Sequence, residues 1–270
     1  MRCNLRLAVL LFTVVAAAPC SPSNQAAQDS SSASGTEAGL RDAYAKHMAR
    51  VRMALPPHSA LPPVLDLTKQ SVDKPTQDRA WEDEYDLLMG PKGIFDPGIP
   101  TPSEATSIGT TYIDAVGVFA LPARNSRAVV IATPSASETA ISPNHRMVYS
   151  RYRLRISKVL KGSRKDGFIN GATVIGVTLG GSVIFPSHHL ATFILAHAGF
   201  PEVGKQYLLF LWKPPHSKET FMISQAYLIA NGTVYPIDTS ADISAYQKGM
   251  PLNEFETKVK DTIAKDVNSE

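Results

Sequence analysis

The chain has 270 residues, of which 44% are hydrophobic and 19% are charged, with 20 Pro, 17 Gly and 2 Cys. This composition is typical of a globular protein with a sizeable core, and it excludes disordered, collagen-like and disulfide-dense chains. The 27 basic and 24 acidic residues give a net charge of +3, which by itself does not indicate a nucleic-acid or anionic partner. The length corresponds to one domain with additions or to two small domains.

The first 20 residues have the pattern of an export signal. Arg2 and Arg6 precede an apolar run over residues 7–18, and no acidic residue lies nearby. A membrane-spanning helix needs about 20 apolar residues, whereas the apolar region of a signal peptide needs roughly 7–15. We therefore expect residues 1–20 to direct export to the periplasm or cell envelope.

Two forms of the exported N-terminus are consistent with the sequence. Ala16-Ala17-Ala18 fits a small-residue cleavage site. Residues 17–20 resemble a bacterial lipobox, in which Cys20 would be lipidated, although Ala17 and Pro19 depart from that pattern. Residues 21–39 are rich in Ser, Ala, Asn and Gln, the composition of a flexible spacer. A membrane tether through Cys20 is therefore one alternative, and cleavage without lipidation is the other.

Both cysteines, Cys3 and Cys20, lie in this N-terminal region. The rest of the chain therefore has no cysteine for an internal disulfide, a nucleophilic thiol or a thiolate metal site. Without Arg2 and Arg6, 25 basic residues remain against 24 acidic residues, a net charge of +1. We expect the folded part to be stabilised by packing, without a cofactor or metal.

Residues 40–125 are expected to form one helix and a proline-rich wrapping segment. Apolar side chains recur with helical spacing at Leu40, Tyr44, Met48 and Val51, and the pattern stops before Pro56. The following region has many prolines and few periodic apolar runs. Residues 78–89 have the pattern of a short acidic helix within it.

From residue 126 to residue 237 the hydrophobic period changes to two. The strongest segment is 147–160, where Tyr152, Leu154 and Ile156 alternate with arginines. Further strands are expected over 128–133, 172–179, 182–185, 190–197, 206–212 and 221–229. Short strands separated by turns at roughly 8–12-residue intervals predict a small antiparallel barrel or sandwich.

The C-terminal part of the pattern contains a hairpin and a helix. Asn231-Gly232 between two apolar runs predicts a type I′ turn that leads into a strand at 233–235. Residues 238–270 read as a linker followed by an amphipathic helix, with its apolar face at Leu252, Phe255, Val259, Ile263 and Val267. The sequence therefore predicts a mainly β protein with flanking helices, an α+β fold.

The segments 148–161 and 204–211 and the Asn231-Gly232 hairpin carry a resemblance to a known family. Tyr152-x-Leu-x-Ile-x-x-Val-Leu-Lys-Gly162, the Gly180-Gly181 turn and Gly204-Lys-Gln-Tyr-Leu-Leu-Phe-Leu211 follow one another in the same order. The chain resembles secreted bacterial proteins of unknown function whose core is similar to the netrin-like domain shared with tissue inhibitors of metalloproteinases. The resemblance covers residues 125–237 and implies an OB-like five-stranded barrel. This chain lacks the cysteine framework of the eukaryotic members, which argues against protease inhibition.

A cluster of cations on the segment 147–160 is the strongest candidate for a binding site. Arg151, Arg153 and Arg155 share one strand face, about 6.6–7 Å apart, and Lys158 follows them. These four residues would suit a polyanion such as an acidic glycan, a lipopolysaccharide phosphate or a nucleic acid without sequence-specific recognition. The alternative is that the charges only keep an exposed strand face soluble and unpaired.

Other chemical patterns are weaker. Ser71 and Lys74 have the Ser-x-x-Lys spacing of penicillin-binding enzymes, but Pro75 disfavours the helix which that chemistry needs. His188 and His189 are adjacent, so on a strand they would point to opposite faces and could not easily share a metal ion. Four acids in five positions over 82–86 favour a solvated helix face over acid–base catalysis.

These observations favour a non-enzymatic binding protein of the bacterial cell envelope with no assigned catalytic residue. One alternative is an envelope hydrolase that lacks a recognisable motif, which would require a pocket formed by several of His145, His188, His189, His197, Glu202 and Asp238. A second alternative is a structural envelope component that associates with itself.

Overall fold

The computed structural model describes residues 37–69, 106–111, 120–142, 147–195, 198–214, 220–239 and 241–267. Within these residues the protein is mainly β, with two α-helices, α1 (Glu37–Ala54) and α3 (Leu252–Val267). Three short 3₁₀ helices also occur, η1 (Leu67–Lys69), η2 (Arg164–Asp166) and η3 (Ala241–Tyr246). The predicted α+β class is confirmed.

The larger sheet contains seven strands and includes the predicted β segments other than 182–185 and 190–197. Its order is β11 (Met250–Pro251), β10 (Thr233–Pro236), β9 (Thr220–Ala230), β5 (Thr173–Leu179), β4 (Val148–Lys161), β3 (Ala128–Ile141) and β8 (Gln206–Trp212). Strand β8 pairs with β9 as well as with β3. The pairings therefore return to their starting point through β3, β4, β5, β9 and β8.

The second sheet contains four strands, and sequence analysis did not predict that these strands would form a sheet of their own. Its order is β1 (Val64–Asp66), β6 (Gly181–Ile184), β7 (Leu190–Leu195) and β2 (Thr106–Thr111). Strands β6 and β7 lie within the predicted barrel region, whereas β1 and β2 come from the predicted wrapping segment. The wrapping segment therefore contributes two sheet strands.

Three strand pairings depart from the antiparallel arrangement that we expected: β1–β6 and β2–β7 in the four-stranded sheet, and β5–β9 in the larger sheet, are parallel. Strands β5 and β9 run parallel, with Ile175 opposite Thr220 and Val177 opposite Met222. A parallel pair needs a long crossover connection, and here the chain passes through β6, β7 and β8 between the two strands. The Asn231-Gly232 turn has positive φ at both residues, which confirms the predicted type I′ hairpin.

Two apolar clusters lie on opposite faces of the larger sheet. The first is enclosed by the five mutually paired strands and includes Tyr152, Leu154 and Ile156 of β4. The second lies beneath α3, where Phe255 and Val259 are fully buried against Phe210 and Tyr227. Leu252 and Ile263 are partly buried there, which confirms the predicted apolar face of α3 as far as Ile263; the side chain of Val267 lies outside the described part of the helix.

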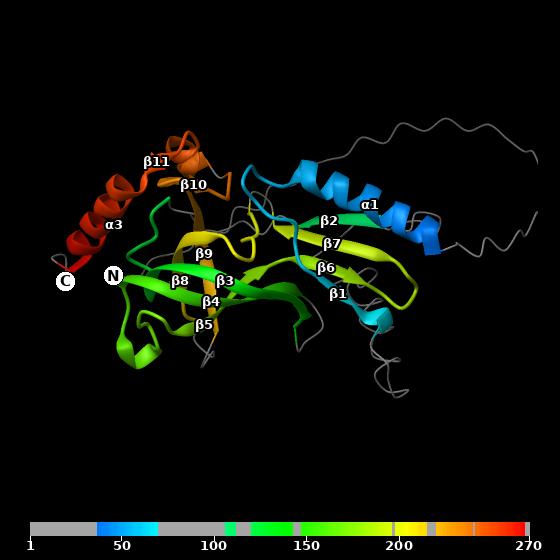
Figure 1. Cartoon of the computed structure of the whole chain (residues 1–270), viewed down its shortest axis with the longest axis horizontal. Helices are drawn as coiled ribbons and strands as arrows, with labels where there is room; N and C mark the ends of the chain where they lie inside the picture. Colours follow the sequence, from blue (N-terminus) through cyan, green and yellow to red (C-terminus); the bar gives the residue numbers. More distant parts are fainter. Residues whose placement is uncertain are drawn as a thin grey trace, which may run out of the picture. The chain divides into compact units, whose positions relative to one another are not determined.

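Helix α1 lies along the four-stranded sheet (Figure 1). Val51 and Leu55 pack against Ile194 of β7 and Phe200 in a smaller apolar cluster. Neither α1 nor any other described helix is long and apolar enough to cross a membrane.

Gly180 joins the two sheets at a point of close backbone approach. Its φ is +97°, and a Cβ atom there would lie 2.5 Å from the carbonyl oxygen of Phe193. Its own carbonyl oxygen accepts a hydrogen bond from the buried Ser150 hydroxyl at 2.8 Å. An L side chain at this position is therefore strained by the backbone angle and also by a clash.

We predict that Gly180→Ala lowers the free energy of unfolding by about 3–4 kcal/mol, because backbone strain and overpacking act together. Gly171→Ala is the matched control, since Gly171 has φ +85° with nothing within 4 Å of its Cβ position. The control should cost only about 1–2 kcal/mol. Urea denaturation of both variants measures the difference, and equal losses would show that the close approach has no energetic effect.

Candidate functional site

The cationic face of β4 is arranged as the alternation predicted. Arg153 and Arg155 are exposed and Arg151 is half-buried. Between them, Tyr152 and Leu154 are buried in the apolar cluster inside the paired strands. The burial of the apolar side chains therefore fixes the three arginines on the outer face of the strand.

Lys158 lies beyond a change of register. Ala132 pairs with Ile156 and Ile131 pairs with Lys158, so Ser157 is an extra residue in β4. The Lys158 Nζ contacts both carboxylate oxygens of Glu256 on α3, at 2.8 and 2.6 Å. Lys158 thus forms an ion pair that connects α3 to β4, and its charge is compensated.

The remaining arginines differ in their partners. Arg151 lies 3.2 Å from a carboxylate oxygen of Glu138 on the neighbouring strand β3, and such an exposed pair contributes little to stability. Among the residues that the structure describes, the guanidinium groups of Arg153 and Arg155 have no ion-pair partner. The structure therefore narrows the uncompensated positive charge of the predicted site to these two residues.

A second polar cluster surrounds Asp238, which follows β10. The Gly199 N–H donates a hydrogen bond to Asp238 Oδ1 at 2.7 Å. The side chain of Gln225 is 1% exposed, and neither of its polar atoms reaches a hydrogen-bond partner among the described residues. Burial raises the pKa of Asp238 to about 7, against the opposing effects of the Gly199 N–H and the nearby Gln225 carboxamide.

A carboxyl group that titrates near neutral pH can exchange a proton with a bound substrate. Of the residues that a hydrolase would bring together, Asp238 and His189 are half-buried, whereas Glu202 and His188 are exposed. His145 and His197 lie outside the described residues. Burial, then Tyr246 and then Asp238 raise the pKa of the Tyr227 phenol, so the titratable neighbour that the structure gives Asp238 is a tyrosine outside the predicted catalytic set.

A buried hydrogen-bonded chain connects α1 to the four-stranded sheet. The His47 Nε2 lies 2.8 Å from Thr192 Oγ1, which lies 2.9 Å from Ser182 Oγ. All three residues are at most 1% exposed. Burial, followed by the charges of His189 and Arg50, lowers the pKa of His47 to about 4. These three side chains are of the types that serve as nucleophile and base in enzymes, but their burial indicates a structural role.

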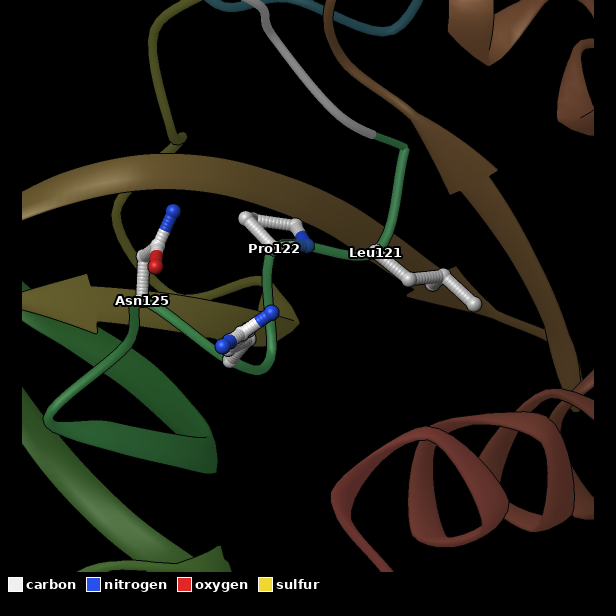
Figure 2. A pocket seen from close by; sticks show the side chains of 4 residues that line it. Leu121, Pro122 and Asn125 are labelled. Atoms are coloured by element: carbon white, nitrogen blue, oxygen red, sulfur yellow. The ribbon is translucent and has the colours of Figure 1, made fainter. Parts of the chain in front are cut away.

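A hollow of about 500 Å³ lies beside the segment that precedes β3. Leu121, Pro122, Arg124 and Asn125 line it (Figure 2). The Leu121 side chain belongs to the apolar cluster under α3, and Lys161 Nζ donates to the Ala123 carbonyl at 2.7 Å. Arg124 is the one charged side chain among these four lining residues.

No group of three or more His, Cys, Asp or Glu side chains within the described residues is placed to hold a metal ion. Cys20, Ser71, Lys74 and the acidic segment 78–89 lie outside those residues. The expectations for lipidation, for the Ser-x-x-Lys spacing and for the acidic helix therefore stay predictions.

Sequence analysis did not identify His47 or Gln225 as buried polar residues. His47 continues the helical spacing from Tyr44 to Val51, so its position on the buried face of α1 was available from the pattern. Because histidine is not an apolar residue, the hydrophobic pattern placed Met48 on the buried face of the helix instead, and Met48 is only partly buried. Gln225 gave no such signal, because an adjacent register shift between β8 and β9 places it.

We predict that His47 makes the protein sensitive to mild acid. The folded-state pKa of about 4 lies below the ordinary value of 6.5, so the unfolded chain takes up the proton first. The stability associated with neutral His47 is present above pH 6.5 and falls as the pH decreases toward 4, by roughly 2–3 kcal/mol. Asp238 acts in the opposite direction, because its raised pKa favours the folded state as the pH falls through about 7.

The difference in free energy of unfolding between wild type and His47→Gln isolates the histidine. Gln cannot titrate, so the free energy of unfolding of the variant should rise relative to that of wild type as the pH is lowered from about 7.5 to about 4.5. His58→Asn is the control, since His58 is exposed and its positive φ of 63° is one that Asn tolerates. A constant difference across this range would exclude His47 as the source of acid sensitivity.

Comparison of the chain with protein-family models, with curated proteins and with solved structures gave no match to any of them.

Proposed function

We propose that the chain is an exported, non-enzymatic binding protein of the bacterial cell envelope that holds a polyanionic ligand on the outer face of β4. The observation that carries this proposal is the pair Arg153 and Arg155, exposed on one strand face without a described ion-pair partner. Two arginines whose positions along the strand are about 6.6–7 Å apart can present their guanidinium groups to successive anionic groups of a polymer.

The pairing of the larger sheet supports an OB-like, netrin-like barrel as the scaffold. The pairings through β3, β4, β5, β9 and β8 involve five strands, the number in an OB-like barrel. Such barrels bind oligomeric ligands on a sheet face and its adjoining loops. An outer face that carries arginines fits that mode of binding.

Export is supported by the basic and apolar pattern of residues 1–20, and a tether is supported by Cys20 and the spacer that follows it. A polyanion in the envelope would then be a glycan or a lipid phosphate rather than a sequence-specific nucleic acid. The hydrolase alternative has support only from the raised pKa of Asp238, and self-association remains a separate hypothesis.

The first test is the double variant Arg153→Ala/Arg155→Ala, measured by salt elution from a dextran sulfate column and by titration with soluble dextran sulfate. We expect binding to weaken roughly thirtyfold, since each basic residue near a polyanionic surface contributes about 1 kcal/mol. Both side chains are exposed, so we expect the variant to keep its fold. Thermal unfolding of the variant checks this.

The matched control is Arg50→Ala/Lys248→Ala, which removes the same charge at two exposed residues outside β4. This control should elute within a narrow range of wild type. Equal weakening by the two double variants would show that only net charge matters, and unchanged binding by Arg153→Ala/Arg155→Ala would refute the assigned site.

The tether is tested separately by mass spectrometry of the protein from a bacterial host. We expect the wild-type chain to begin at an acylated Cys20 and to partition into detergent. Cys20→Ser should lose both properties while retaining binding to dextran sulfate. An unmodified N-terminus beyond residue 20 in the wild-type protein would exclude lipidation and leave export without a tether.

A further inference from the structure

Three segments meet at one end of the larger sheet. The segment 121–127 leads into β3, the 3₁₀ helix η2 follows β4, and the third segment follows β8. Val129 of β3 pairs with Lys161 of β4, and Ala128 of β3 pairs with Leu211 of β8. Both pairings are antiparallel, so the start of β3 lies beside the ends of β4 and β8.

Polar contacts hold these segments together. The Arg127 guanidinium lies 2.8 and 2.6 Å from Asp166 Oδ2 in η2, and Lys213 Nζ lies 3.6 Å from Asp166 Oδ1. Lys161 Nζ donates to the carbonyl oxygen of Arg124 at 3.4 Å and to that of the preceding residue at 2.7 Å. The segment before β3 is therefore fixed to the chain that follows both neighbouring strands.

Positive charge is in excess at this end of the sheet. Residues 121–127, 161–167 and 212–213 contain one acid, Asp166, and six basic residues, Arg124, Arg127, Lys161, Arg164, Lys165 and Lys213. Asp166 is already paired. The side chains of Arg124, Arg164 and Lys165 are exposed and have no ion-pair partner among the residues that the structure describes. Helix α3 adds no net charge, because residues 252–265 contain three acids and three bases.

The hollow of about 500 Å³ lies on the segment before β3, and its volume falls within the roughly 300–1,000 Å³ of small-ligand sites. Leu121 and Pro122 give it apolar surface, and Figure 2 shows Pro122 between Leu121 and Asn125. Leu121 also packs against the apolar cluster under α3. Arg124 and Asn125 give the hollow a guanidinium and a carboxamide, which both donate hydrogen bonds. Apolar surface and an unpaired cation thus occur together in four lining residues.

We propose that this hollow binds a small amphiphilic anion, a molecule that carries one carboxylate or phosphate group on an alkyl chain. The guanidinium group of Arg124 binds the head group with two hydrogen bonds. The surrounding cations raise the local concentration of anions. Leu121 and Pro122 cover part of the alkyl chain, and each methylene group removed from water strengthens binding.

This site is separate from the outer face of β4. Arg155 precedes Lys161 by six residues, roughly 20 Å along an extended strand, and Lys161 is the residue that contacts the Arg124 carbonyl. A hydrophilic polymer would leave the apolar surface of the hollow in contact with water, whereas an alkyl chain covers it. The inference goes beyond the proposed function and does not depend on it, because it uses neither Arg153 nor Arg155.

The test is isothermal titration calorimetry of the purified chain with Cys20→Ser, so that no acyl chain attached to the protein competes for the hollow. Decanoate and decyl phosphate are the ligands. Decanol, which lacks the charge, and inorganic phosphate, which lacks the chain, are the controls. We expect one equivalent of either amphiphile to bind, with little binding of either control. Octanoate should bind more weakly than decanoate, by up to about fourfold for each methylene group removed.

The cation is tested with Arg124→Gln, which keeps a hydrogen-bond donor and removes the charge. This variant should bind both amphiphiles roughly ten- to a hundredfold more weakly. Its thermal unfolding should match that of the parent, because Arg124 is exposed. Arg50→Gln is the matched control, since Arg50 is an exposed arginine on α1, and it should bind both amphiphiles as the parent does.

The apolar half of the hollow is tested with Leu121→Ala. This variant should reduce the difference in affinity between decanoate and octanoate, because less of the alkyl chain is covered. That ratio is independent of the fraction of protein that is folded, and thermal unfolding measures that fraction. An unchanged ratio in a folded Leu121→Ala variant would overturn the assignment of the alkyl chain to Leu121.

The remaining outcomes decide the site as a whole. Binding of one amphiphile but not the other supports the site and identifies the head group. Decanol bound as tightly as decanoate, no binding of either amphiphile, or equal weakening by Arg124→Gln and Arg50→Gln would each overturn the proposal. Arg153→Ala/Arg155→Ala should leave decanoate binding unchanged while it weakens binding to dextran sulfate, so failure of the proposed function and failure of this inference are distinguishable.

Discussion

The inward burial of alternate residues of β4 is the constraint on which the rest of the larger sheet depends. Tyr152, Leu154 and Ile156 fill the space enclosed by the paired strands, and a slip by one residue would expose all three and bury the arginines. The same strand pairs with β3 on one side and β5 on the other. The position of the arginines is therefore a consequence of core packing, and the chemistry of the outer face follows from it.

Breaks in that alternation have a different effect. The extra residue at Ser157 turns Lys158 toward α3, where Glu256 binds it. A segment that reads as one continuous cationic stripe in the sequence is thereby divided into two parts. One part, Lys158, attaches helix α3 to the sheet. The other part, Arg153 and Arg155, has no ion-pair partner among the described residues.

Local patterns predicted the elements, but not how distant elements combine. The alternation of β4, the Asn231-Gly232 turn and the apolar face of α3 are each specified by neighbouring residues, and the structure confirms them. The four-stranded sheet joins β1 and β2 to the β6–β7 pair, and no local period encodes pairings of such separation. The division of the cationic cluster could not be predicted from the sequence for the same reason, since Glu256 lies far from Lys158 in the chain.

The parallel contact between β5 and β9 has a consequence for how the chain reaches its native state. Strand β5 is synthesised before β6, β7 and β8, and its second partner is available only after all of them. Until then one side of β5 presents unpaired backbone groups, which can recruit a strand from another molecule. Formation of the β5–β9 pair is a long-range event of the kind that slows folding, so newly synthesised molecules are most vulnerable to aggregation during the interval before β9 pairs with β5.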